Sequence, residues 1–329
     1  MRSIFRTVVA PLQRFLEEEA ASGVLLFVAA VAALLLANGP LADVYETAVH
    51  SSLPLPGRAI PIHAIVNDGL MALFFFLVGM EIKRELVAGE LRSVSSAVLP
   101  GIAAAGGMLV PAAIYATLNP GGAAARGWAI PMATDIAFSI GCLTLLKKRV
   151  PAALVVFLTA LAIFDDIGGI AAGVLLGLLV PASISGEAPL DRWIERLHGP
   201  VAFGIVPLFA LVNSGVHLHG AGISDLLQPV SLGVALGLFA GKQVGITSFT
   251  WAAVKLRMAR MPGDATLHQL HGVALIGGIG FTVALFLADL AFATEPVLLA
   301  QAKLGILAGS LLSGVAGALL LLLTPADSR

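Results

Sequence analysis

Residues 161–170 read LAIFDDIGGI, and this stretch decides how the rest of the chain is interpreted. Two adjacent carboxylates, Asp165 and Asp166, stand in a run that is otherwise apolar for more than a helical turn on either side. In a membrane, an ionisable side chain costs several kcal/mol to bury, so it is by default a candidate functional group. The first question is therefore whether this chain lies in lipid.

The composition indicates that it does. Of 329 residues, 58% are hydrophobic and 12% are charged, whereas soluble domains carry about 25% charged residues. The net charge of −1 gives no indication of a nucleic-acid partner, and the single cysteine, Cys142, excludes an internal disulfide. We expect an all-α, polytopic membrane protein that forms one transport domain over residues 1–329.

Eight apolar segments are long enough to cross the hydrocarbon core, which takes about 20 helical residues. The predicted spans are 22–38, 65–82, 95–117, 128–146, 201–217, 228–254, 270–292 and 300–323. Residues 1–20, which mix apolar and charged side chains, predict an amphipathic segment at the membrane surface, with a frayed tail as the alternative. Lys and Arg cluster in alternate loops, which places both termini on the cytoplasmic side of an inner membrane.

A ninth apolar segment, 151–180, does not fit this count. As one straight helix it would be about 45 Å long, and a single crossing would reverse every later loop against its charge. A segment that enters and returns, bending near Gly168 and Gly169, satisfies the loop charges. One long tilted helix is the alternative.

Five ionisable residues within the predicted spans and segment 151–180 are singled out as candidate functional groups. They are Asp68, Asp135, Asp165, Asp166 and Lys242. Asp68 is near an outer end, so it is either an in-membrane acid or an interfacial residue that reaches water. The others sit too far inside their spans for that explanation.

Asp135 has a local signature of its own. Pro131 interrupts the helical hydrogen bonds and frees carbonyl groups just before Thr134 and Asp135. Carbonyl, hydroxyl and carboxylate oxygens suit a small alkali cation better than a transition metal. The glycines of LIGGIGFTVALF weaken a second span, and two broken spans in different halves indicate a transporter site.

Lys242 supplies the opposite charge. Gly233, Gly237, Gly241 and Gly245 recur at a spacing of four, which gives its helix a face that another backbone can approach closely. Such an approach would bring the amine toward the carboxylates. In the loop GMEIKRELVAGELR, Glu81 and Glu85 belong either to a solvated helix end or to a proton-sensing group at the mouth of the ion path.

On these residues the sequence resembles the NhaA family of sodium/proton antiporters. The matching stretches run over nearly the whole chain: VNDGLMALFFFLVGMEIKREL, GWAIPMATDIAFSIG, LAIFDDIGGI, VPLFALVNSGV, GKQVGI, GIGFTVALFLADLAF and AKLGILAGS. The resemblance implies the inverted repeats with two discontinuous helices that are a general property of this family. It also implies that Asp165 and Asp166 are the paired aspartates, Thr134 and Asp135 the unwound-helix ligands, and Lys242 the buried lysine. Asp68 matches a further in-membrane acid, and Glu81 and Glu85 match residues associated with pH sensing.

The chain departs from the family pattern in one place. After FDDIGG the family continues through further spans before the equivalent of AGVLLGLLVP, and here that material, on the order of three spans, is absent. Segment 151–180 thus resembles half of one family helix joined to half of another, which agrees with the loop charges.

The main functional hypothesis is secondary exchange of sodium or lithium for protons, supporting pH and sodium homeostasis. Asp166 and Asp135 are the expected sodium ligands, Thr134 assists, and Asp165 pairs with Lys242. Two carboxylates titrating against one monovalent cation imply an electrogenic exchange. No cofactor is expected, because sodium, lithium and protons are substrates; the other expected partners are membrane lipid and a second copy of the chain.

Two alternatives remain at this point. The first is a deletion variant of the same family that is stable in the membrane but does not transport. The second is an intramembrane aspartyl protease, although adjacent Asp165 and Asp166 lack the usual local signature and a protease gives no reason for a buried Lys242.

Overall fold

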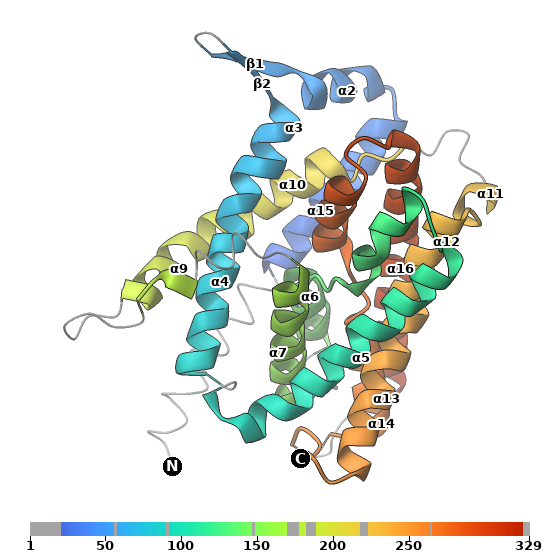
Figure 1. Ribbon diagram of the computed structural model, residues 1–329. Helices are drawn as coiled ribbons and strands as arrows, with labels where there is room; N and C mark the ends of the chain where they lie inside the picture. Colours follow the sequence, from blue (N-terminus) through green and yellow to red (C-terminus); the bar gives the residue numbers. More distant parts are fainter. Residues whose placement is uncertain are drawn as a thin grey trace.

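The computed structural model describes residues 21–55, 58–89, 92–146, 149–169, 178–181, 189–217, 223–263 and 265–324 (Figure 1). Side chains at 55, 58, 94–96, 166–169 and 223 are outside the description. The predicted surface segment 1–20 and the predicted bend of segment 151–180 therefore lie wholly or largely outside the described residues. Within the described part, the only strands form one small hairpin, and all other regular elements are helices.

The first half of the chain begins with the helix Ala21–Asn38. It continues with α2 (Ala42–His50), β1 (Ser52–Leu55), β2 (Arg58–Pro61), α3 (Ile62–Ala64), η1 (Ile65–Leu70), α4 (Met71–Val87), α5 (Val94–Leu118), η3 (Ala124–Met132), α6 (Ile136–Leu145) and α7 (Ala152–Gly169).

The second half begins with α9 (Pro189–Pro200), η4 (Val201–Ile205) and α10 (Val206–Asn213). After these come α11 (Ile223–Leu226), α12 (Pro229–Leu236), η5 (Gly237–Gly241), α13 (Lys242–Lys255), α14 (Leu267–Ile276), α15 (Phe281–Ala291) and α16 (Pro296–Leu323).

These elements match the eight predicted spans in length and apolar composition. Seven helices in the described chain are long and apolar enough to span a bilayer. An eighth span is formed by α14 and α15 together, which are bent by 45° at a short break. The chain is therefore a multi-pass, all-helical membrane protein. We call the end of the bundle that carries β1 and β2 the outer end, and the opposite end the inner end.

The outer connection 39–61 contains structure that the sequence reading did not anticipate. The short helix α2 is anchored by Tyr45, whose hydroxyl donates to the Leu211 carbonyl oxygen at 2.6 Å. Burial raises the pKa of Tyr45 to about 12, so this donor keeps its proton at any physiological pH. β1 and β2 then pair antiparallel, with Ser52 opposite Pro61.

The fifth crossing begins earlier than predicted. Residues 181–200 were expected to form an inner loop because of their charge, but Pro189–Pro200 is the helix α9, continuous with α10 in one span of 25 residues. The helix is amphipathic: Leu190 and Ile194 are buried while the charged residues face outward. The charged residues of this stretch made it resemble a loop in the sequence, although it forms a helix with one apolar face.

The predicted glycine face brings two helices into close contact. A Cβ atom added at Gly241 would lie 2.9 Å from the Pro111 Cα, and one at Gly237 would meet the side chain of Pro131. Gly245 approaches the backbone of Gly106 in the same way. The run α12–η5–α13 therefore packs along α5 without intervening side chains, as small residues allow in membranes.

Both flanks of segment 151–180 lie at the inner end. Lys83, near the end of α4, donates from Nζ to the carbonyl oxygens of Leu178 at 2.7 Å and Val180 at 2.6 Å. Before α7, Arg149 donates from Nη1 to the carbonyl oxygen of Leu322, near the end of α16. Figure 1 shows the ends of α4 and α13 toward the same, lower, end of the bundle. This arrangement supports the predicted re-entry over one long crossing.

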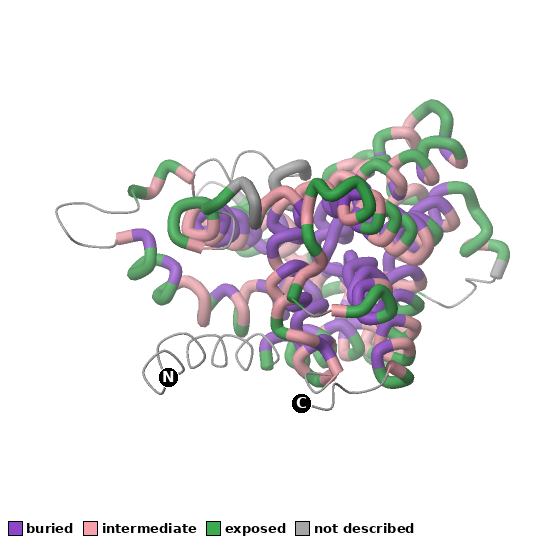
Figure 2. Tube along the Cα trace, turned by 90° about the horizontal axis from the view of Figure 1, so that it is seen from below, coloured by how far each residue is buried: buried purple, intermediate pink, exposed green. Residues whose placement is uncertain are grey.

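The helices form two groups around a buried centre. α4 runs beside α9 and α10 on one side of Figure 1, while α5, α12, α13, α14 and α16 pack on the other. Figure 2 shows the buried residues concentrated toward the middle of the bundle and the exposed residues at its rim. The interrupted helices meet in this middle region.

Labelling of single cysteines tests the re-entry. In a Cys142→Ser background, we expect Ala152→Cys and Pro181→Cys to react with an impermeant maleimide from the same side of the membrane. Thr47→Cys on α2 should react from the opposite side, because all three positions are exposed but α2 lies at the outer end. Labelling of Pro181→Cys together with Thr47→Cys would show that the segment crosses the membrane once.

Candidate functional site

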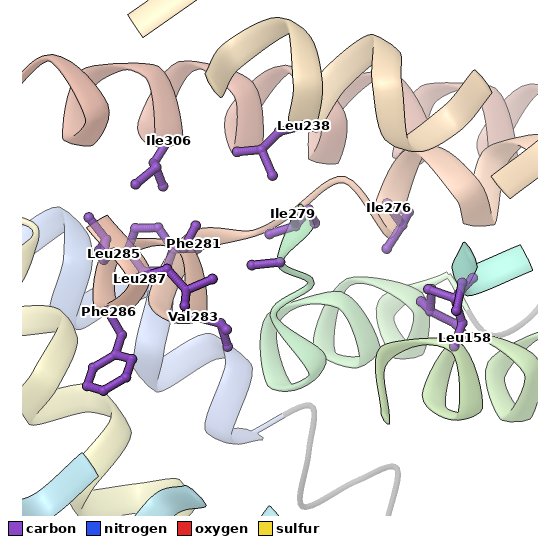
Figure 3. Packing of buried hydrophobic residues seen from close by; sticks show 14 of the residues in the cluster. Leu158, Leu238, Ile276, Ile279, Phe281, Val283, Leu285, Phe286, Leu287 and Ile306 are labelled. Carbon is purple, nitrogen blue, oxygen red and sulfur yellow. The ribbon is translucent and has the colours of Figure 1, made fainter. Parts of the chain in front are cut away.

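Two broken helices cross at their breaks. The first ends as the 3₁₀ helix η3 at Met132, runs extended through Ala133–Asp135 and resumes as α6. The second breaks between Ile276 and Phe281. The Asp135 amide donates to the Ile279 carbonyl oxygen at 2.7 Å, which joins the two breaks directly. Figure 3 shows the non-helical chain from Ile276 through Ile279 to Phe281, with Leu238 and Ile306 approaching from neighbouring helices.

Asp135 receives hydrogen bonds from the first turns of two helices. Its Oδ1 accepts from the Phe138 amide at 2.9 Å, which caps α6. Its Oδ2 accepts from the amide of Thr282 at 3.0 Å and from that residue's hydroxyl at 2.5 Å, at the start of α15. Helix N-termini carry partial positive charge, so this buried carboxylate lies where negative charge is favoured.

Thr134, Asp165 and Lys242 form a second buried group on the other side of the same extended segment. Lys242 Nζ forms an ion pair with Asp165 Oδ2 and donates to Thr134 Oγ1 at 2.8 Å. The Thr134 hydroxyl lies 2.9 Å from both Asp165 Oδ2 and the Gly277 carbonyl oxygen, either of which can accept its proton. The ion-paired side chains are 0% and 1% exposed. A pair this deeply buried is desolvated at considerable cost, and loss of either partner would leave an uncompensated charge.

One oxygen of this group lacks a partner. Asp165 Oδ1 is buried and has no hydrogen bond from any residue in the described part of the chain. The same carboxylate lies beside the Thr134 hydroxyl, which in turn contacts the Gly277 carbonyl oxygen. These are hard oxygen ligands of the kind that alkali cations take. Among the described residues, no group of three His, Cys, Asp or Glu side chains could hold a metal ion.

The extended backbone separates the two aspartates. Successive side chains of an extended chain point to opposite sides, so Thr134 faces Asp165 and Lys242 while Asp135 faces α15. The described hydrogen bonds do not join Asp135 to Asp165. Asp135 and Asp165 thus make their hydrogen bonds on opposite sides of the extended segment, with different partners.

The other predicted residues lie elsewhere or outside the description. The backbone of Asp166 belongs to α7, but its side chain is outside the described residues. Asp68 is exposed on η1, and no described hydrogen bond or ion pair joins it to the central group. Glu81 on α4 lies 3.5 Å from the His198 ring on α9, between Oε1 and Nδ1. Glu85 is one turn further along α4, half-buried near its end.

The sequence reading missed two contributors to the site. Thr282 holds Asp135 with both its amide and its hydroxyl, and the Gly277 carbonyl oxygen contacts Thr134. The sequence feature that could have indicated both is the stretch GGIGFT, in which Thr282 follows the glycines that break the helix. That pattern identifies a weakened helix, but it does not say which residues meet across the crossing.

Comparison with known proteins agrees with this architecture. The family described as Na+/H+ antiporter 1 matches residues 13–172 and 169–321. The Na(+)/H(+) antiporter NhaA 1 of Myxococcus xanthus is 48% identical over 422 aligned residues, which take in 97% of this chain and 94% of the relative. The NhaA proteins of Anaeromyxobacter sp. and Bordetella parapertussis are each 44% identical, over 98% and 96% of the chain and 93% and 97% of their own length.

The alignments also locate the shortening. Since the chain has 329 residues, an alignment of 422 residues requires a stretch of the Myxococcus relative with no counterpart here. The two family matches meet at 169–172, inside segment 151–180, which is consistent with the shortening predicted from the sequence. With matches over nearly its whole length, the chain belongs to the NhaA family of Na+/H+ antiporters.

Proposed function

We propose that this chain exchanges sodium or lithium for protons electrogenically, with coupling at Asp135, Asp165 and Asp166. The observation that carries the proposal is the buried group of Thr134, Asp165 and Lys242 at the crossing of two broken helices. Family membership supplies the class of activity, Na+/H+ antiport, and transporter membership removes the protease alternative. The residue roles are inferences from geometry.

Competition for one carboxylate provides the coupling. In the described state, the Lys242 ammonium neutralises Asp165. A cation that binds Asp165, through the unpartnered Oδ1 and the Thr134 hydroxyl, removes the need for that ammonium, so Lys242 can release a proton or move away. Protons that return to the lysine or the carboxylates expel the cation. Each ligand stabilises one state of the site, which is sufficient for exchange.

Asp166 and Asp135 complete the proposed site. Asp166 follows Asp165 directly in α7, and we assign it as a cation ligand. Asp135 is held by α6 and α15 and stabilises the crossing, so its contact with the cation requires a small shift of the extended segment. Asp68 is an accessory acid, and Glu81 and Glu85 respond to pH, in this proposal.

Two protons per cation make the exchange sensitive to membrane potential. One net charge then crosses per cycle, which is worth about 2.3 kcal/mol per 100 mV. In an inner membrane with a negative interior, the potential drives proton entry and sodium exit. The distribution of Lys and Arg in the loops supports cytoplasmic termini in this proposal. Assembly as a homodimer stays a prediction.

The transport-inactive alternative rests on the shortened middle. The relatives contain a stretch that this chain lacks, whereas the described Thr134, Asp165 and Lys242 remain in contact. We favour activity because the charged centre is intact and its segment re-enters at the inner end. A purified chain that shows no sodium-dependent proton movement at any pH would establish the inactive variant.

Substitution of the proposed ligands tests the site. In proteoliposomes with an enclosed pH dye, we expect Asp166→Asn and Asp165→Asn to reduce sodium-driven proton movement to the level of empty vesicles, because each removes a titrating carboxylate. Asp191→Asn, an exposed acid on α9, is the matched control and should keep the wild-type rate. Wild-type exchange by Asp166→Asn would remove that residue from the site.

The electrogenic stoichiometry is tested with an imposed potential. We expect a potassium diffusion potential, negative inside, to accelerate sodium exit coupled to proton entry, and the opposite potential to slow it. The initial rate is followed at a fixed pH gradient, with and without valinomycin. A rate that does not respond to the potential would indicate one proton per sodium ion.

A further inference from the structure

A second buried polar cluster lies near the outer end of the bundle. The Asn67 amide nitrogen on η1 donates to Asp289 Oδ2 on α15 at 2.8 Å. The amides of Asn67 and Asn213 donate to each other, at 3.1 Å and 2.8 Å. Lys303 Nζ on α16 lies 3.5 Å from Asp289 Oδ1. We call Asn67, Asn213, Asp289 and Lys303 the outer cluster.

The outer cluster is connected to the central site by one face of α15. Thr282, which holds Asp135, and Asp289 are seven residues apart, so they lie on the same face about 10 Å from each other along the axis. Phe286 stands between them on that face. The stripe Thr282–Phe286–Asp289 therefore runs from the central site to the outer end.

An aromatic layer separates the two polar regions. The Phe286 ring lies 4.9 Å from that of Phe75 on α4 and 6.3 Å from that of Phe209 on α10, between ring centroids. All three side chains are buried, and Figure 3 shows the Phe286 ring directed away from Ile306. The three aromatic rings of Phe75, Phe209 and Phe286 thus lie between the outer cluster and the central site.

Asp289 is incompletely satisfied in this arrangement. Its Oδ1 is buried and has no hydrogen bond from the residues that the structure describes. Its ion-pair distance to Lys303 is longer than a hydrogen bond to an ammonium, which is about 2.7–2.9 Å. The side chains of Asp289 and Lys303 keep 10% and 17% exposure, so the pair is not sealed inside the bundle. A buried carboxylate oxygen without a donor favours any ligand that brings positive charge to it.

We propose that Asp289, with the amides of Asn67 and Asn213, is a docking site for the transported monovalent cation on its way between the outer side and Asp135. This inference rests on the proposed exchange function. Lys303 pairs with the Asp289 carboxylate when the site is empty and moves away from it when a cation binds. A half-turn of both amides keeps their mutual hydrogen bonds and turns the Asn67 oxygen toward Asp289. It gives up the bonds from Asn67 to Asp289 and from Asn213 to the Phe209 carbonyl oxygen. It also replaces the Asn67 amide nitrogen, which lies 3.0 Å from His63 Nε2, by an oxygen at that contact.

A purely structural latch makes different predictions. In that case the bond from Asn67 to Asp289 only ties α15 to η1, and loss of either Asp289 or Lys303 loosens the same contact. Both losses would then change transport in the same direction, and from both sides of the membrane. A docking site instead gives opposite effects, because Asp289 binds the cation and Lys303 competes with it.

The experiment measures the apparent KM for sodium separately from each side, in right-side-out and inside-out membrane vesicles. For sodium presented at the outer end, we expect Asp289→Asn to raise KM about tenfold, the effect of losing one charged ligand. Lys303→Gln should lower it severalfold, and KM from the inner side should not change. The matched control is Asp43→Asn, an exposed acid on α2 at the same end, which should match the wild type.

Three results would each overturn the docking site. They are KM shifts in the same direction for Asp289→Asn and Lys303→Gln, equal KM shifts from both sides of the membrane, and unchanged KM values. If a single variant does not fold, the neutral pair Asp289→Asn with Lys303→Gln retains the test, with a raised outer KM expected.

Binding of ²²Na⁺ separates this inference from the proposed function. Measured on the purified Asp135→Asn protein, residual sodium binding should weaken when Asp289→Asn is added. Weaker binding would support the docking site even if the wild-type chain failed to exchange sodium for protons. Exchange by the wild type, with sodium binding that does not depend on Asp289, would overturn the docking site and leave the proposed function standing.

Discussion

A buried ion pair between Asp165 and Lys242 is the constraint on which the centre of this protein depends. Both side chains are removed from water and lipid, so each is tolerable only in the presence of the other. Thr134 connects the pair to the crossing of the broken helices by accepting from the ammonium. The pair therefore fixes where α7 and α13 meet the extended segment before α6.

The rest of the bundle is arranged so that this contact can form. Gly241 and Gly245 let α13 approach the backbone of α5, which places Lys242 in the centre rather than against lipid. The two breaks leave carbonyl and amide groups free of helical hydrogen bonds where side chains converge. Asp135 accepts hydrogen bonds from amides in the first turns of both α6 and α15. Irregular backbone at this depth is tolerated because other protein groups meet its hydrogen bonds.

Sequence reasoning recovered the candidate spans and the buried charges Asp135, Asp165 and Lys242 because both follow from local physics. Apolar length identifies a span, and a charge inside a span is conspicuous. Segment 151–180 could be predicted to re-enter because positive residues mark a loop as cytoplasmic, which fixes whether the number of crossings before that loop is even or odd. The helix α9 was missed because its charged face resembles a loop, and the partners of Asp135 were missed because Thr282 is 147 positions away in sequence. Which residues meet across a crossing depends on helix rotation, which periodicity in a uniformly apolar span does not reveal.

The coupling free energy between Asp165 and Lys242 decides whether this ion pair holds the centre of the bundle together. A double-mutant cycle of Asp165→Asn and Lys242→Met, measured by reversible unfolding in mixed detergent, isolates it. We predict that Lys242→Met alone costs about 3–5 kcal/mol because it leaves a buried carboxylate unpaired, and that the double variant recovers much of this loss. Costs that add to within about 0.5 kcal/mol would show that the two groups do not interact, and the account of the site would be wrong.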